Sequence, residues 1–113
     1  MNVDNESISF ENEEEAKKLL IESRNRIDEI DNELFDLIYQ RTSLAKDIAL
    51  SKEYLGMPIF DEEREKVVHA KVDALCEDLG LDTEIIDQIV NMLTILNKNE
   101  QEKILRRNAD GQY

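Results

Sequence analysis

The feature that most constrains the fold of this chain is a helical pattern of about forty residues that contains neither glycine nor proline. It runs from about Glu15 to Tyr54, and Gly56 and Pro58 then end it. At 1.5 Å per residue such a helix is about 60 Å long, which is too long for a compact globule of 113 residues. Two shorter helices of the same chain cannot cover it. We therefore expect a homodimer in which the long helices of two copies pack together.

Two further helices are predicted after the glycine–proline break. Asp61 is expected to cap a second helix, which Gly80 ends. Asp82 or Thr83 is expected to cap a third, which continues to about Leu105. The predicted fold is therefore all-α, with three helices per chain (one long, two shorter) in an intertwined helical homodimer.

The chain divides by composition into one domain and two ends. We predict an acidic, flexible N-terminal segment at residues 1–14, a helical domain at 15–105 and a C-terminal tail at 106–113. The net charge of −13 argues against nucleic acid or an anionic membrane as a partner. No apolar run approaches the roughly 20 residues of a membrane span, and no signal peptide is recognisable. Cys76, the only cysteine, is expected to be a buried thiol in a cytoplasmic protein.

Arg41 interrupts the apolar seam of the long helix. The other seam positions, which recur every seven residues, are apolar: Ile27, Leu34 and Ile48 at one position, with Ile30, Leu37 and Leu44 at the other. A guanidinium cannot lose its charge, and burying it unpaired costs several kcal/mol. We therefore expect an anion at Arg41. The alternative is that a polar residue here only fixes the register of a coiled coil.

Three more polar residues occupy inward positions. Lys52 lies eleven residues after Arg41, near the same face and about 16 Å along the axis, so the two cations could hold opposite ends of one small molecule. Asn97 and Gln101 continue the apolar stripe of the third helix and would need hydrogen-bond partners if buried. Each could instead be a solvated helix end. His69, with no second histidine in the chain, is expected to be solvated.

Arg24 lies 17 residues before Arg41, about 25 Å away along a straight helix. It therefore cannot share a small ligand with Arg41 of the same chain. In an antiparallel dimer, however, Arg24 of one subunit can approach the middle of the other long helix. This geometry predicts two composite sites per dimer. No serine–histidine–aspartate set, phosphate-binding loop or zinc motif is present, and we expect neither a metal nor a cofactor.

Five sequence elements, in order and spacing, resemble those of the all-helical, AroQ-type chorismate mutases. They cover about Ala16 to Leu105 and are Arg24-x-x-Ile27-Asp28-x-Ile30-Asp31, Arg41-x-x-Leu44-Ala45, Lys52, Pro58-Ile59-x-Asp61-x-x-Arg64-Glu65 and Asn97-x-x-x-Gln101. The resemblance implies conversion of chorismate to prephenate by an intramolecular [3,3] (Claisen) rearrangement, in phenylalanine and tyrosine biosynthesis. Such a reaction needs no nucleophile, general base or metal. The alternatives are an isochorismate–pyruvate lyase of the same fold and a non-catalytic helical dimerisation module.

The same resemblance assigns catalytic roles to four residues. Arg41 would bind a substrate carboxylate, and Lys52 would contact a carboxylate and the ether oxygen of the breaking C–O bond. Gln101 would donate to the same ether oxygen, and Glu65 would hold the ring hydroxyl.

Four other residues would bind the substrate. Arg24 of the partner subunit would bind the second carboxylate, and Asn97 would also reach a carboxylate. The backbone around Asp61 would contact the ring hydroxyl, and Arg64 would support the site.

Overall fold

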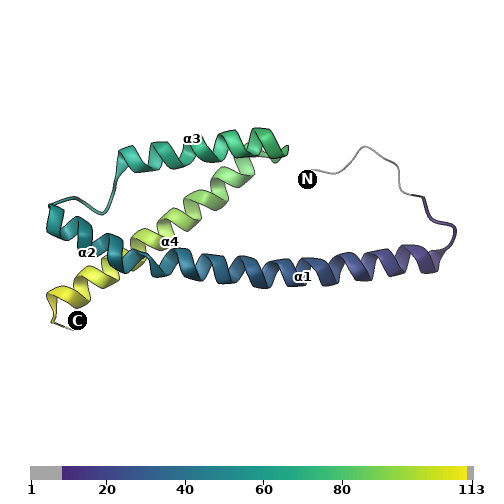
Figure 1. Cartoon of the computed structure of the whole chain (residues 1–113), viewed down its shortest axis with the longest axis horizontal. Coiled ribbons are helices and arrows are strands. Elements are labelled where there is room, and N and C mark those ends of the chain that lie inside the picture. Colours follow the sequence, from purple (N-terminus) through teal and green to yellow (C-terminus); the bar gives the residue numbers. More distant parts are fainter. Residues whose placement is uncertain (1–8, 112–113) are drawn as a thin grey trace. The chain divides into compact units, whose positions relative to one another are not determined.

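The computed structural model describes residues 9–111, and every regular element in that range is an α-helix (Figure 1). The helices are α1 (Glu13–Ser43), α2 (Ala45–Leu55), α3 (Glu62–Leu79) and α4 (Thr83–Ala109). The all-α prediction is therefore confirmed for the described residues. They form two units, which divide between Tyr39 and Gln40.

The first unit consists mainly of α1. Asn12 caps this helix, because its Oδ1 accepts from the Glu15 backbone N–H at 3.0 Å, while the Glu15 carboxylate accepts from the Glu11 N–H at 3.0 Å. The helix consequently begins at Glu13, inside the segment predicted to be flexible; residues 1–8 of that segment lie outside the described residues. No residue of α1 is buried.

The predicted long helix is interrupted at one residue, Leu44. Its backbone angles (φ −70°, ψ −13°) remain right-handed but lie closer to those of a 3₁₀ turn than of an α-helix. The Ile48 N–H still donates to the Leu44 carbonyl at 3.1 Å, so helical hydrogen bonding resumes at once in α2. The expectation of an uninterrupted helix is wrong only at this position.

The predicted helix boundaries are largely confirmed. Asp61 caps α3 by accepting from the Arg64 N–H at 3.1 Å, and Asp82 caps α4 in the same way. Gly56 and Gly80 follow α2 and α3 with φ near +70°, a conformation that favours glycine (φ 70° and 69°).

The predicted end of the last helix is four residues too early. Helix α4 continues from Leu105 to Ala109, because Arg106 and Arg107 in its last turn are good helix formers that also complement the helix dipole. The helical part of the chain thus extends into the predicted tail.

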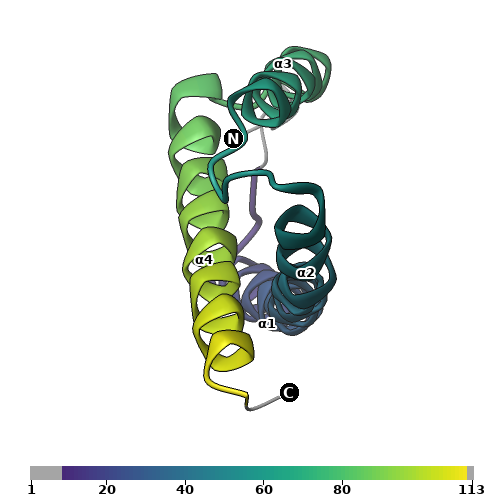
Figure 2. The same ribbon diagram turned by 90° about the vertical axis from the view of Figure 1, so that its left-hand side faces the viewer.

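In the second unit α4 packs against both α2 and α3 (Figure 2). Ala45 and Ala49, one turn apart on α2, are fully buried, and their small side chains allow close approach of a neighbouring helix. Cys76 of α3 and Ile104 of α4 complete the buried apolar set among residues 9–111, as expected for Cys76. No helix among the described residues is both long and apolar enough to cross a membrane.

His69 is not the solvated residue that the sequence indicated. It is half-buried, with Nδ1 3.4 Å from Oδ1 of Asp87 across the contact between α3 and α4. Partial removal from water raises the pKa of nearby Asp73 above its ordinary value of 3.8, and the hydrogen bond and charge of Asp87 raise it further, whereas His69 lowers it. The sequence pattern could not reveal this cluster, because its members come from two helices.

Candidate functional site

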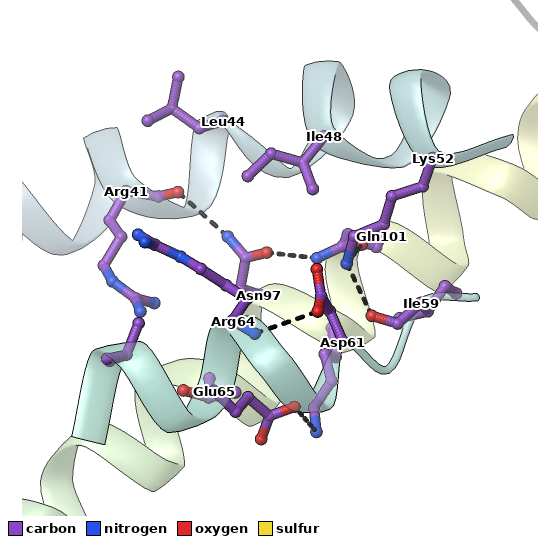
Figure 3. A pocket seen from close by; sticks show the side chains of 13 residues that line it. Arg41, Leu44, Ile48, Lys52, Ile59, Asp61, Arg64, Glu65, Asn97 and Gln101 are labelled. Carbon is purple, nitrogen blue, oxygen red and sulfur yellow. Dashed lines mark hydrogen bonds and ion pairs between the residues drawn. The ribbon is translucent and has the colours of Figure 1, made fainter. Parts of the chain in front are cut away.

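A cavity of about 360 Å³ lies within the second unit, between residues of α2, α3, α4 and the C-terminal end of α1 (Figure 3). Its volume is within the range of small-molecule sites. Seven of the eight predicted site residues line it: Arg41, Lys52, Asp61, Arg64, Glu65, Asn97 and Gln101. The eighth, Arg24, is an exposed residue of α1 in the first unit and does not line the cavity.

A chain of hydrogen bonds crosses the cavity wall from α2 to α4. Lys52 Nζ donates to the Ile59 carbonyl at 2.7 Å and to Gln101 Oε1 at 3.1 Å. Gln101 Nε2 donates to Asn97 Oδ1 at 2.7 Å, and Asn97 Nδ2 donates to the Arg41 carbonyl at 3.2 Å. Gln101 is buried, with 3% of its surface exposed. These bonds fix the amide of Gln101 with its oxygen toward the ammonium, so its second N–H is the donor left for a ligand.

Arg41 is half-buried, and its Nη1 donates to the Leu93 carbonyl at 3.0 Å. The sequence predicted an anion here, which stays a prediction; within the protein the guanidinium meets a peptide dipole. A guanidinium has five N–H donors, so this contact orients the side chain without using its capacity for a carboxylate. Leu44 and Ile48, from the same apolar seam, also line the cavity.

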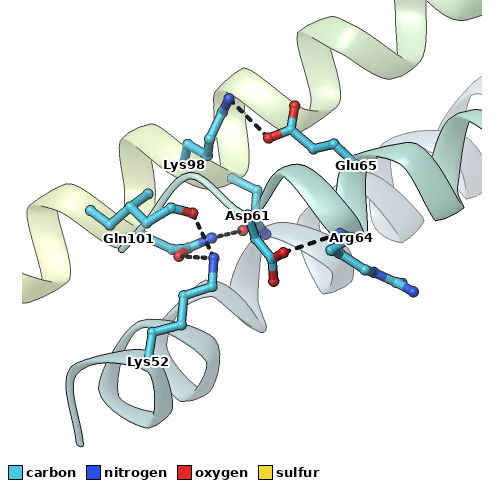
Figure 4. Close-up of polar contacts among 8 residues, drawn as sticks. Lys52, Asp61, Arg64, Glu65, Lys98 and Gln101 are labelled. Atoms are coloured by element: carbon cyan, nitrogen blue, oxygen red, sulfur yellow. Dashed lines mark hydrogen bonds and ion pairs between the residues drawn. The ribbon is translucent and has the colours of Figure 1, made fainter. Parts of the chain in front are cut away.

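Two carboxylates and two further cations also line the cavity: Asp61, Glu65, Arg64 and Lys98 (Figure 4). Asp61 and Arg64 meet at the first turn of α3, through the backbone N–H of Arg64. Glu65 Oε2 lies 3.4 Å from Lys98 Nζ of α4, and that ammonium lies 5.1 Å from the centre of the Phe60 ring.

Lys98 is a cavity residue that sequence reasoning missed. Its partner Glu65 is 33 positions away, so no local pattern links the two. One signal was available: Thr94, Lys98 and Gln101, at spacings of four and three residues, share a helical face and all line the cavity.

The cavity is electropositive although the chain is acidic. Four cations line it (Arg41, Lys52, Arg64 and Lys98) against two carboxylates (Asp61 and Glu65), which gives 4 − 2 = +2, whereas the whole chain carries −13. A local excess of positive charge between helices favours a small anion with more than one negative group.

The fold and this cavity define a class: a helical protein whose pocket presents cations and two hydrogen-bonded amides to a small, multiply charged anion. Comparisons with known proteins agree. The family described as "Chorismate mutase type II" matches residues 23–108. The chain therefore belongs to the type II chorismate mutase family, which favours mutase activity over lyase activity and over a purely structural role.

Three relatives illustrate the similarity. A protein of Methanocaldococcus jannaschii named "Chorismate mutase" is 44% identical over 86 residues, which cover 76% of this chain and 87% of that protein. The "Bifunctional chorismate mutase/prephenate dehydratase" of Buchnera aphidicola is 30% identical over 81% of this chain and 24% of its own length. The "T-protein" of Enterobacter agglomerans is 31% identical over 59% of this chain and 18% of its own length. No solved structure matches significantly.

Proposed function

We propose that this chain converts chorismate to prephenate, with no covalent intermediate, inside the electropositive cavity. The observation that carries the proposal is the contact of Lys52 Nζ with the buried Gln101 amide, at 3.1 Å, in a chain of the chorismate mutase family. The substrate has two carboxylates, a ring hydroxyl and the ether oxygen of the bond that breaks. The cavity offers a polar group of suitable chemistry for each of them.

Two effects would supply the rate acceleration. Cations at both ends of the cavity, Arg41 and Lys52, hold the substrate in the compact chair-like conformer from which the rearrangement proceeds. As the C–O bond stretches, negative charge develops on the ether oxygen, and the Lys52 ammonium and the free N–H of Gln101 stabilise it. Because Gln101 is held by Lys52 and Asn97 before the substrate arrives, little reorganisation is needed during the reaction.

The remaining residues would position the substrate. Glu65 and the backbone near Asp61 bind the ring hydroxyl through hydrogen bonds, and Arg64 adds positive charge at the start of α3. Asn97 is directed by its bonds to Gln101 and to the Arg41 carbonyl, so its reach to a carboxylate depends on these two contacts.

We further propose that the active form is an intertwined homodimer. Helix α1 spans 31 residues, roughly 46 Å, and none of them is buried. Its seam residues Ile27, Ile30, Leu34 and Leu37 are 43–59% exposed, an apolar surface that a soluble chain normally covers with a partner. A second copy of α1 supplies a matching surface, and Arg24 on it would complete the neighbouring cavity. A cytoplasmic location is also proposed, because the lone thiol of Cys76 is buried and free.

The direct test measures two products from purified protein: prephenate from chorismate and pyruvate from isochorismate. Prephenate formation that is lost in Lys52→Met supports the proposal. Pyruvate release without prephenate would assign a lyase instead, and no turnover of either substrate would reject both.

The composite site has its own test, in which two inactive variants are mixed. Arg24→Ala and Arg41→Ala should each abolish turnover, but a mixed dimer regains one site with both arginines intact. Random exchange of equal amounts should restore about a quarter of wild-type activity. Full activity of Arg24→Ala alone, or no recovery after proven subunit exchange, would contradict a site shared between subunits.

A further inference from the structure

Lys98 occupies a position in the cavity that no assigned role explains. Its Nζ lies 3.4 Å from Glu65 Oε2, and the two side chains are 27% and 26% exposed. Ion pairs within a single helix are three or four residues apart and more open; Lys103, which pairs with Glu100, is 55% exposed. The pair of Lys98 and Glu65 instead links α4 to α3 at the cavity wall (Figure 4).

A third residue restrains the same ammonium. The ring of Phe60, just before the cap of α3, has its centre 5.1 Å from Lys98 Nζ, within the range of a cation–π interaction. Lys98 is thus held by a carboxylate on one side and an aromatic ring on another. Both contacts reduce the freedom of a long side chain, which in turn limits the orientations open to Glu65.

The negative charge of the proposed substrate explains why Glu65 would need a cation beside it. Under the proposed function, on which this inference rests, Glu65 accepts a hydrogen bond from the ring hydroxyl of a substrate that carries two negative charges. An ionised carboxylate beside a dianion is unfavourable unless a cation offsets it. Lys98 contacts Glu65 Oε2, whereas Arg41 donates to the Leu93 carbonyl and Lys52 donates to Ile59 and Gln101.

We infer that Lys98 is a positioning residue, held by Phe60, which keeps the Glu65 carboxylate directed at the ring hydroxyl of the substrate. The ring hydroxyl takes no part in the bonds that break and form, so its contact stabilises the bound substrate and the transition state alike. Loss of the positioning should therefore raise KM and leave kcat nearly unchanged.

The expected effects follow the strength of the contacts. Lys98→Met should raise KM about tenfold, which corresponds to the lower end of the free-energy range for a hydrogen bond to a charged group. The kcat of this variant should stay within about twofold of the wild-type value. Lys98→Arg, which keeps the charge, should retain most of the affinity. Phe60→Leu removes the ring but not the charge, and should raise KM by a smaller factor. The matched control is Lys103→Met, which removes an ion-paired lysine from the same helix outside the cavity and should leave both constants unchanged.

A double-mutant cycle with Glu65→Gln tests whether Lys98 acts through Glu65. If it does, adding Lys98→Met to Glu65→Gln should change KM by less than about twofold. A full tenfold increase in that background would overturn the inference, since Lys98 would then act on the substrate directly. Wild-type KM in Lys98→Met would overturn it as well. Circular dichroism of each variant separates these results from misfolding, and failure of the wild type to turn over chorismate would reject the proposed function instead.

Discussion

Replacement of Gln101 by glutamate changes the side-chain NH₂ group, with its two N–H donors, into an oxygen at the most constrained polar position of the cavity. Gln101 is 3% exposed, accepts from Lys52 at 3.1 Å and donates to Asn97 at 2.7 Å. In Gln101→Glu the new carboxylate can still accept from Lys52. It cannot donate to Asn97 Oδ1, and it has no proton for the ether oxygen. The ionised variant should therefore be almost inactive.

The magnitude of the loss in activity follows from the one donor to the ether oxygen that is removed. Removing one preorganised donor to a developing oxyanion costs about 10²–10³ in kcat, or about 2.7–4 kcal/mol. Protonation of the new carboxyl restores a donor, so activity should recover as the pH falls toward about 5. The wild-type amide does not titrate, and wild-type activity should stay flat from mildly acidic to mildly alkaline pH.

The assay follows chorismate disappearance across this pH range for the wild type, Gln101→Glu and the control Gln101→Met. The methionine variant lacks a donor at every pH and should be inactive throughout. Wild-type turnover by Gln101→Glu at alkaline pH would refute the assignment of Gln101 as the donor. A Gln101→Met activity that also rises in acid would refute the explanation by carboxyl protonation.

Three further predictions concern charge and assembly. Arg41→Ala should lower kcat/KM at least about a hundredfold. It should change the free energy of unfolding by under about 1 kcal/mol, because it removes one part-buried hydrogen bond to Leu93. Denaturant titration beside the activity assay would reveal a purely structural role of Arg41 as a large loss of stability. Leu34→Glu places a charge on the exposed seam of α1 and should yield monomers in sedimentation experiments; an unchanged mass would exclude this seam as the interface. The raised pKa of Asp73 means that the folded state holds this proton more tightly, so stability falls as pH rises above the ordinary value of 3.8. Asp73→Asn should consequently raise the denaturation midpoint at neutral pH and have no effect below about pH 3, and a lower midpoint at neutral pH would contradict this sign.

The sequence by itself determined the helices and most of their ends. Asp61, Asp82, Gly56 and Gly80 act within one turn of chain, where a side-chain oxygen or a positive φ is sufficient, and the structure confirms all four. The interruption at Leu44 escaped prediction because its residue type favours helix and no glycine or proline marks it.

The predicted site residues came from two sources. Arg41 was recognisable as a charge in an apolar repeat, and Asn97 and Gln101 as amides on an apolar stripe, because helical periodicity is a local property. Their likeness to family motifs then suggested the roles that the variants above test.

Only the tertiary structure decided how those residues meet. Packing of α4 against α2 and α3 brings Gln101 to Lys52 across 49 positions and Lys98 to Glu65 across 33. The same packing places His69, which was expected to be solvated, in contact with Asp87. Helical periodicity indicates which residues lie on the same face of a helix, but not which helix packs against that face. That choice depends on how the buried Ala45, Ala49, Cys76 and Ile104 fit together, and it turned separate polar positions into one electropositive cavity.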